Sequence, residues 1–241
     1  MNENWEHVLS EYNNAGELLG IDAGLGGGFL NYLSGLNAVQ KAQVVARVAK
    51  SLPPSIGSRA EFEKHFKELP EGIKDDLVKG SIRLADFNIR GVKRVTSKTV
   101  KLFETSDAKV SGGTSIAQGK LPKGMVLLVS SITMLVGTSA DLTEDKIKAI
   151  DFGSIKAVPA IANGEFYLKA NKKQIIPEGK SNRVFVTDNN QLVNLGFWKL
   201  HNPRMIRDEE LIEFVVELGT LDGVAANAHI MVELNGTITT P

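Results

Sequence analysis

The sequence predicts an α+β protein with a mainly β core, in which a helical N-terminal region (residues 1–79) precedes an antiparallel β-sandwich domain (residues 80–241). Two observations carry this prediction. After Gly80 the apolar residues change from helical spacing to the alternation that is typical of half-buried strands. From there, short apolar segments recur at regular intervals between turn residues, which favours a sandwich or barrel over βαβ units.

The composition excludes several classes of protein. Among 241 residues, 42% are hydrophobic and 23% are charged, as in ordinary globular proteins. The formal net charge is zero, so the whole-chain charge points neither to nucleic acid nor to a membrane surface. The chain has no cysteine, which excludes disulfides, thiolate metal sites and thiol catalysis. The first residues lack the basic and apolar regions of a secretory signal, so we expect a protein used in the cytoplasm or in a particle assembled there.

The first helix is predicted over residues 4–19, where apolar side chains recur at helical spacing. Its other face is acidic. A solvated face near a helix N-terminus explains this charge most simply; an acidic arm that docks on a neighbouring subunit is the alternative. The arm's interface candidates are Glu3, Glu6, Glu11 and Glu17.

A glycine-rich segment, residues 20–28, follows this helix. We interpret it as a flexible hinge, because a dinucleotide-binding loop would need a preceding strand and a third glycine where Phe29 stands. Further helices are expected over about residues 29–50, after the capping box formed by Ser58 and Glu61, and over residues 73–79.

The most apolar run of the chain is Gly124–Gly137, which carries no charge. It is too short to span a bilayer as a helix, which needs about 20 residues. Its valines and isoleucines, interrupted by Ser130 and Ser131, favour one long or bent strand at the centre of the core. Eight or nine strands are expected in total, over residues 81–90, 98–105, 124–136, 153–161, 164–170, 183–187, 191–200, 211–218 and 228–238.

Turn chemistry separates these strands. Asn163-Gly164 predicts a tight hairpin, and Asp188-Asn189-Asn190 predicts another. Asn202-Pro203 is expected to end a strand. Residues 107–120 are expected to form an exposed loop, residues 142–150 a short helix, and residues 237–241 a tail that folds back or reaches out.

A basic strip runs through residues 79–101, where seven basic residues accompany a single acidic one, Asp86. A subunit interface, a nucleic-acid contact made through phosphates and a plain solvated face all fit such a strip. The zero net charge favours complementary patches on neighbouring copies. Its members are Lys79, Arg83, Arg90, Lys93, Arg94, Lys98 and Lys101, and their acidic counterparts would include Glu209, Glu210 and Glu213.

No catalytic constellation is evident. The four histidines are too far apart for a metal-ligand spacing, and the sequence contains neither a nucleophile-elbow nor an H-E-x-x-H motif. Residues 201–210 gather the side chains that a hydrolase uses, but a charged loop between two strands explains them better, because no second segment offers a matching partner. We therefore expect no catalytic residues, no metal and no cofactor; an enzyme built on a double-stranded β-helix fits poorly.

In its order of elements, the chain resembles the jelly-roll virion proteins of small viruses and bacteriophages. The resemblance is carried by the apolar strand Gly124–Gly137, the turns Asn163-Gly164 and Asp188–Asn190, and the closing segment His229–Pro241. It covers about residues 80–241 and implies a single jelly-roll-like sandwich. Many such capsid proteins have a basic N-terminal arm that binds the genome, whereas the arm of this chain is acidic.

The sequence therefore predicts a structural, self-assembling capsid or capsid-associated subunit of a bacteriophage, located in the virion after assembly in the host cytoplasm. Its partners would be copies of itself and other virion proteins, with nucleic acid a weaker candidate and no transmembrane segment. The alternative is a sandwich-type binding module for a carbohydrate or protein ligand, with Trp198 and Tyr167 as contact residues. Trp198 also fits a core position, because it lies in an apolar run.

Overall fold

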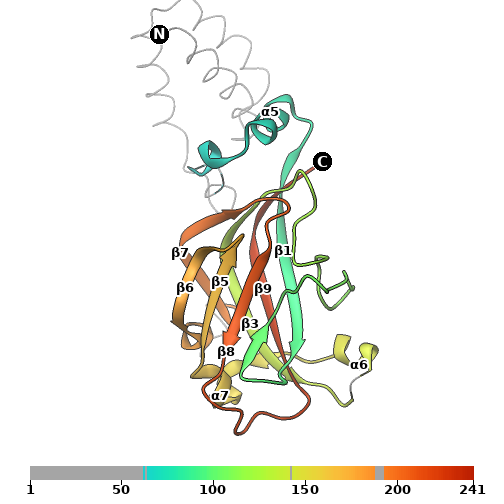
Figure 1. Ribbon diagram of the computed structural model, residues 1–241, viewed down its shortest axis with the longest axis vertical. Coiled ribbons are helices and arrows are strands. Elements are labelled where there is room, and N and C mark those ends of the chain that lie inside the picture. The colour runs from blue at the N-terminus through green and yellow to red at the C-terminus, as the bar shows by residue number, and fades with distance from the viewer. Residues whose placement is uncertain (1–61, 63, 142, 188–192) are drawn as a thin grey trace, which may run out of the picture. The chain divides into compact units, whose positions relative to one another are not determined.

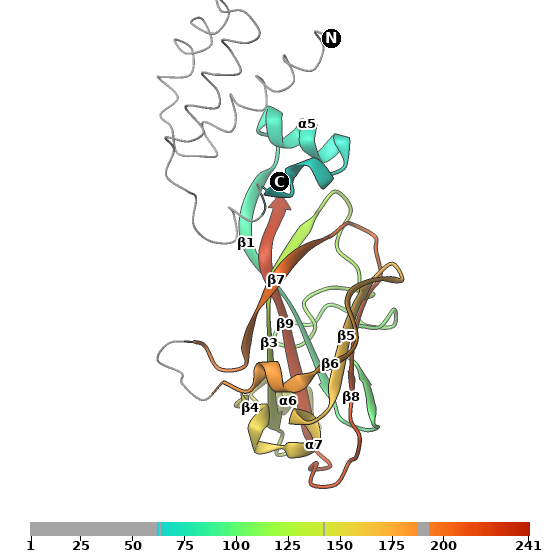
Figure 2. The same cartoon turned by 90° about the vertical axis from the view of Figure 1, so that its left-hand side faces the viewer.

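Figures 1 and 2 show the computed structural model, which describes residue 62 and residues 64–141, 143–187 and 193–241. The chain divides into two compact units, residues 1–83 with 240–241, and residues 84–239. The described elements, in chain order, are η1 (Phe66–Glu68), α5 (Glu71–Lys79), β1 (Arg83–Arg94), β2 (Thr99–Lys101), β3 (Leu127–Thr138), α6 (Glu144–Lys148), β4 (Gly153–Ser154), η2 (Ile155–Ala157), α7 (Pro159–Ala162), β5 (Glu165–Ala170), β6 (Lys173–Ser181), η3 (Asn182–Phe185), β7 (Phe197–Ile206), β8 (Ile212–Glu217) and β9 (Ala228–Thr240).

In the first unit, the helix expected over residues 73–79 is confirmed as α5. It ends where Gly80 adopts a left-handed conformation (φ +72°), and the Ser81 backbone N–H donates to the Asp76 carbonyl oxygen at 3.0 Å. The earlier predictions, namely the helices over residues 4–19 and 29–50, the glycine hinge and the capping box, lie outside the described residues.

The second unit is an antiparallel β-sandwich, as predicted. One sheet has the strand order β1-β9-β3, and β7 and β4 both pair with the far edge of β3. The other sheet has the order β2-β8-β5-β6. The two sheets pack face to face around the core (Figure 2).

The apolar run that dominates the sequence is β3, the central strand of the first sheet; it is one long strand, as predicted, and a bulge bends it. The registers with both β9 and β7 shift between Val129 and Ser131, so Ser130 lies in a bulge. Gly236 of β9 lies opposite this bulge, where a Cβ atom would be 1.8 Å from the Leu128 carbonyl oxygen. The bend therefore depends on a glycine about 100 residues further along the chain.

The strand predicted over residues 153–161 is wrong in most of its length. Only the two residues of β4 are extended, and the chain then forms η2 and α7. The Ser154 side chain caps η2 by accepting from the Lys156 N–H, and Pro159 occupies the first turn of α7, where its missing N–H costs nothing. Asn163 ends α7, so the hairpin predicted at Asn163-Gly164 is also wrong.

The hairpin in this region lies between β5 and β6. Its loop is Asn171-Lys172, with φ of +46° and +66°, the signs that a type I′ turn requires at both central residues. Sequence analysis missed β6, because Pro177 and Gly179 interrupt it. Both are tolerated because β6 is the edge strand of its sheet. The strand predicted over residues 183–187 is wrong, because residues 183–185 belong to η3 instead.

The strand predicted over residues 191–200 begins later and extends further, as β7. Asn202-Pro203 does not end it: residues 200–203 form a bulge opposite Ser130, in an edge strand of the sheet. Residues 188–190, the second predicted hairpin, lie outside the described residues. The expected tail is wrong as well, because β9 continues to Thr240.

Candidate functional site

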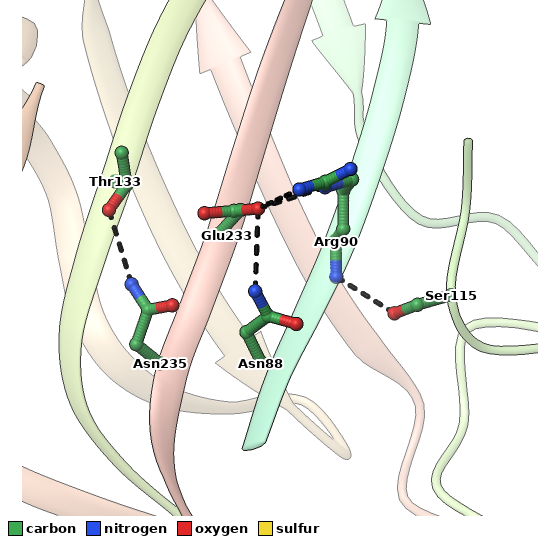
Figure 3. A network of polar contacts seen from close by, with 6 residues as sticks. All are labelled: Asn88, Arg90, Ser115, Thr133, Glu233 and Asn235. Atoms are coloured by element: carbon green, nitrogen blue, oxygen red, sulfur yellow. Dashed lines mark hydrogen bonds and ion pairs between the residues drawn. The ribbon is translucent and has the colours of Figure 1, made fainter. Parts of the chain in front are cut away.

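A row of polar contacts crosses the outer face of the first sheet, from β1 through β9 to β3 (Figure 3). Glu233 is its centre. Its Oε1 accepts from Arg90 Nη2 at 2.6 Å and Nε at 2.8 Å, and from Asn88 Nδ2 at 3.4 Å. Asn235, two residues along β9, donates from Nδ2 to Thr133 Oγ1 at 3.1 Å. These cross-strand pairs fix the register of three strands on the face that points away from the core.

The loop of residues 107–120 covers part of the edge of β1. The Arg90 backbone N–H donates to Ser115 Oγ at 2.8 Å, and the Ser115 backbone N–H donates to the Arg90 carbonyl oxygen at 2.9 Å. One serine therefore satisfies both backbone groups of Arg90 that face away from β9.

A second ionic cluster connects the same loop to β1. Lys93 Nζ lies 2.6 Å from Asp107 Oδ1 and 3.0 Å from Glu104 Oε2. Partial burial lowers the pKa of Lys93, but the hydrogen bonds and charges of the two carboxylates outweigh it, and the net pKa is raised. Asp107 Oδ2 also accepts from the Glu104 backbone N–H at 2.8 Å, so the ion pair closes a turn of the loop.

The basic strip is therefore not one continuous surface. Arg90 and Lys93 form ion pairs, and Arg94 Nε donates to the Ala226 carbonyl oxygen at 2.8 Å. Lys98 and Lys101 are exposed around β2, in the other sheet of the sandwich. The remaining two members, Lys79 at the end of α5 and Arg83 at the start of β1, are exposed and belong to the first unit.

The acidic candidates lie apart as well. Glu209 and Glu210 lie in the connection between β7 and β8, where Glu209 has a left-handed backbone (φ +57°) and Glu210 Oε2 accepts from the Arg207 N–H. Glu213 lies on β8, opposite Lys169 of β5. The four candidates of the N-terminal arm, Glu3, Glu6, Glu11 and Glu17, lie outside the described residues.

The outer face of the second sheet carries Tyr167 among charged side chains. Lys169 Nζ lies 4.4 Å from the centre of the Tyr167 ring and 2.6 Å from Glu178 Oε1. Burial is the main cause that raises the pKa of Tyr167, and Glu217, Glu178 and Glu213 add to the effect while Lys169 opposes it. Tyr167 therefore keeps its proton and can donate a hydrogen bond.

Trp198 is half-buried and packs against the core of the sandwich. Its ring meets Phe166 and Phe185 edge to face, with ring centroids 5.9 and 6.0 Å apart, and Phe166 stacks on Phe214 at 5.5 Å. Lys180 Nζ lies 5.1 Å from the centre of the Trp198 ring. Because Phe166 points inward, its neighbour Tyr167 points outward. Trp198 thus packs against the core from the first sheet, whereas Tyr167 lies on the outer face of the second sheet, so the two aromatic candidates for ligand contact share no surface.

His229 is a buried titratable group of the sandwich. It is 2% exposed, near the start of β9, and its Nδ1 lies 3.0 Å from the Asn227 carbonyl oxygen. Burial lowers its pKa; the hydrogen bond to Asn227 raises it, and the nearby Arg94 charge lowers it further, so the net pKa is lowered. His229 is therefore held neutral inside the fold.

The described residues contain no group of three or more histidine, aspartate or glutamate side chains placed to hold a metal ion. The contacts that order the outer face of the first sheet come instead from Asn88, Ser115, Thr133, Glu233 and Asn235. The sequence offers no local signal for them, because each contact joins residues at least 25 positions apart.

No protein-family model matches the chain, and no curated protein matches its sequence. In the part of the chain that the structure describes, none of the helices is both long and apolar enough to cross a membrane.

Proposed function

We propose that this chain is a self-assembling structural subunit of a bacteriophage virion, a capsid or capsid-associated protein, and that its sandwich is a single jelly roll. Its partners would be copies of itself and other virion proteins, and it would act in the virion after assembly in the host cytoplasm. The observation that carries the proposal is the pairing of the strands.

Without the two-residue β4, the sandwich has eight strands. The first pairs with the last (β1·β9), the second with the seventh (β2·β8), the third with the sixth (β3·β7), and the fourth with the fifth (β5·β6). Successive pairs alternate between the two sheets. This is the order expected when one long antiparallel ribbon is wound into a double sheet of two Greek keys, an architecture used by viral capsid proteins, lectins and cupins.

Two features favour the structural role among these classes. The interior between the sheets is filled by apolar side chains and four aromatic rings, which supports a rigid tile. Both outer faces carry charges held in fixed positions, such as Arg90 with Glu233 and Lys169 with Glu178. Ordered surface charges suit contacts whose register has to be specified.

The basic strip favours a protein partner over nucleic acid. Two of its seven members, Arg90 and Lys93, are paired with carboxylates of the same chain, which leaves fewer cations for phosphates. The alternative of a ligand-binding module loses one of its two contact residues, because Trp198 faces the core, and we do not propose it.

Light scattering and negative-stain microscopy of the purified full chain test the proposal. We expect the mass to rise with protein concentration and to depend on salt, with regular particles or sheets at high concentration. A protein that stays monomeric at every concentration and salt strength would contradict it.

A further inference from the structure

The outer face of the second sheet carries two like charges that no described residue neutralises. Glu217 of β8 lies directly opposite Glu165 of β5, and both residues are exposed. Residues directly opposite in an antiparallel pair have Cβ atoms about 4.5–5.5 Å apart, a position where like charges are destabilising. Within the described part of the chain, neither carboxylate has a hydrogen bond or an ion pair. A cation supplied from elsewhere would therefore relieve their repulsion.

The same face also holds an unpaired cation. Val100 of β2 belongs to the core, so its neighbour Lys101 points outward, and Lys101 is exposed. Lys101 lies opposite Val215 of β8, which makes Glu217 its diagonal neighbour, yet the two form no ion pair. Among the described residues, the ammonium group of Lys101 has no hydrogen bond or ion pair of any kind.

The remainder of this face is apolar, aromatic or already paired. Lys169 Nζ lies 2.6 Å from Glu178 Oε1, and Glu213 lies opposite Lys169. Val215 is 3% exposed although it points away from the core, and Tyr167 lies directly opposite it on β5. The Tyr167 hydroxyl has no hydrogen bond to any described residue. The face therefore presents a small apolar and aromatic patch that is bordered by unpaired charges of both signs.

We propose that a second copy of this chain packs the same sheet face on this one, with Lys101 of each copy placed between Glu165 and Glu217 of the other. The inference rests on the proposed function, because it assumes that the chain assembles with itself. A twofold axis presents the same patch on both subunits, so one patch must carry both the cation and its acceptors, and this patch does. An ammonium group has three N–H donors, enough for both carboxylates.

The strand registers are compatible with this packing. Lys101 lies two residues along the strands from the carboxylate pair and one or two strands across from it. These steps correspond to about 7 Å along and about 5–10 Å across. A twofold axis in the plane of the interface, along the opposite diagonal, exchanges the two positions and passes close to Val215 and Tyr167.

Tyr167 of each copy therefore meets its counterpart near the axis. Tyrosine is enriched at the centres of protein interfaces. The strands of the two copies cross near a right angle in this arrangement, which is one of the two ways in which sheets pack face to face.

Charge reversal tests the contact. In Lys101→Glu, and in the double variant Glu165→Lys with Glu217→Lys, like charges would meet at both symmetric contacts. Sedimentation velocity of the full chain should show each variant associating only at concentrations about tenfold or more above those of the wild type. Lys146→Glu, at an exposed position of α6, is the matched control and should associate as the wild type does.

Mixing the two reversed variants gives a sharper test. Across a mixed pair, both contacts again join opposite charges, so an equimolar mixture should associate as the wild type does although neither variant does so alone. A folding defect cannot produce this rescue, and circular dichroism checks that each variant is folded. A mixture of folded variants that associates no better than its components would overturn the pairing of Lys101 with the two carboxylates.

The wild type separates this inference from the proposed function. If it assembles and Lys101→Glu assembles at the same concentration, the contact is overturned and the assembly proposal stands. If EDTA disperses the wild-type assembly while Lys101→Glu assembles normally, the carboxylates bind a divalent cation and the contact is likewise overturned. If the wild type is monomeric at every concentration and salt strength, both proposals are overturned.

Discussion

Arg90 and Glu233 face each other across β1 and β9, with Arg90 Nη2 2.6 Å and Nε 2.8 Å from one carboxylate oxygen. They are 143 positions apart in the chain, and their side chains are 39% and 15% exposed. The pair joins the first strand of the sandwich to the last, on a face that the core does not stabilise.

Glu233→Gln should lower the free energy of unfolding by about 1 kcal/mol. The change removes the charge of a partly buried carboxylate that accepts two hydrogen bonds from Arg90. Urea denaturation measures this loss. Glu217→Gln is the matched control: Glu217 is exposed and faces Glu165 across the sheet, so neutralising it should leave stability unchanged or slightly higher. Equal losses in the two variants would show that the Arg90 pair contributes nothing specific.

Gly236→Ala should destabilise the fold by about 3 kcal/mol or more, because the new Cβ would overlap the Leu128 carbonyl oxygen at the bulge of β3. Gly219→Ala provides the comparison, since no atom lies within 4 Å of the Cβ it would add. Thermal unfolding followed by circular dichroism distinguishes them: only the first variant should lose many degrees or fail to fold. A Gly236→Ala protein as stable as wild type would mean that β3 and β9 can pair without the bulge.

Lys172→Gly should stabilise the protein by about 0.5–1 kcal/mol. A non-glycine residue in the left-handed region costs about 1–2 kcal/mol, and glycine relieves this cost while losing about 0.5–1 kcal/mol through the flexibility of the unfolded chain. The measurement is again the free energy of unfolding in urea. Lys173→Gly, one residue later and inside β6, should destabilise instead; the opposite order would contradict the turn geometry.

His229 should make stability depend on pH. Its pKa is lower in the folded state than the usual 6.5, so its contribution is fully present above about pH 6.5 and is lost as the pH falls through the lower folded value. The unfolded state binds the proton first and is favoured in acid. His229→Gln should remove this part of the pH dependence. The check compares unfolding free energies at pH 7.5 and 5.5 for both proteins; an identical change in the two would exclude His229 as the cause.

The sequence predicted the elements whose signal is local. The valines and isoleucines of β3, the alternation in β8 and the glycine that ends α5 specify their structures within a few residues. β6 and the second half of β7 were missed for one reason. Pro177 and Pro203 normally end strands, and they are acceptable here only because both strands lie at sheet edges, a property of the finished topology.

The arrangement of the candidate surface residues could not be predicted from the sequence for the same reason. Counting charges along residues 79–101 predicted a basic strip, but the count could not include Glu104, Asp107 and Glu233, which neutralise part of it in space. Trp198 could be assigned to a core or a surface only once its sheet was known.

The pairing of the first strand with the last also constrains how the protein is made. At about 5–20 residues per second, roughly 7–30 s of synthesis separate Arg90 from Glu233, and β1 has no native neighbour on the β9 side during that time. A nascent chain therefore cannot close its sandwich until β9 has left the ribosome. Contacts this distant in sequence also make folding slow. Truncation of β9 should leave a chain with an open sheet, and whatever keeps unfinished chains apart in the cell acts before the 13 residues of β9 are in place.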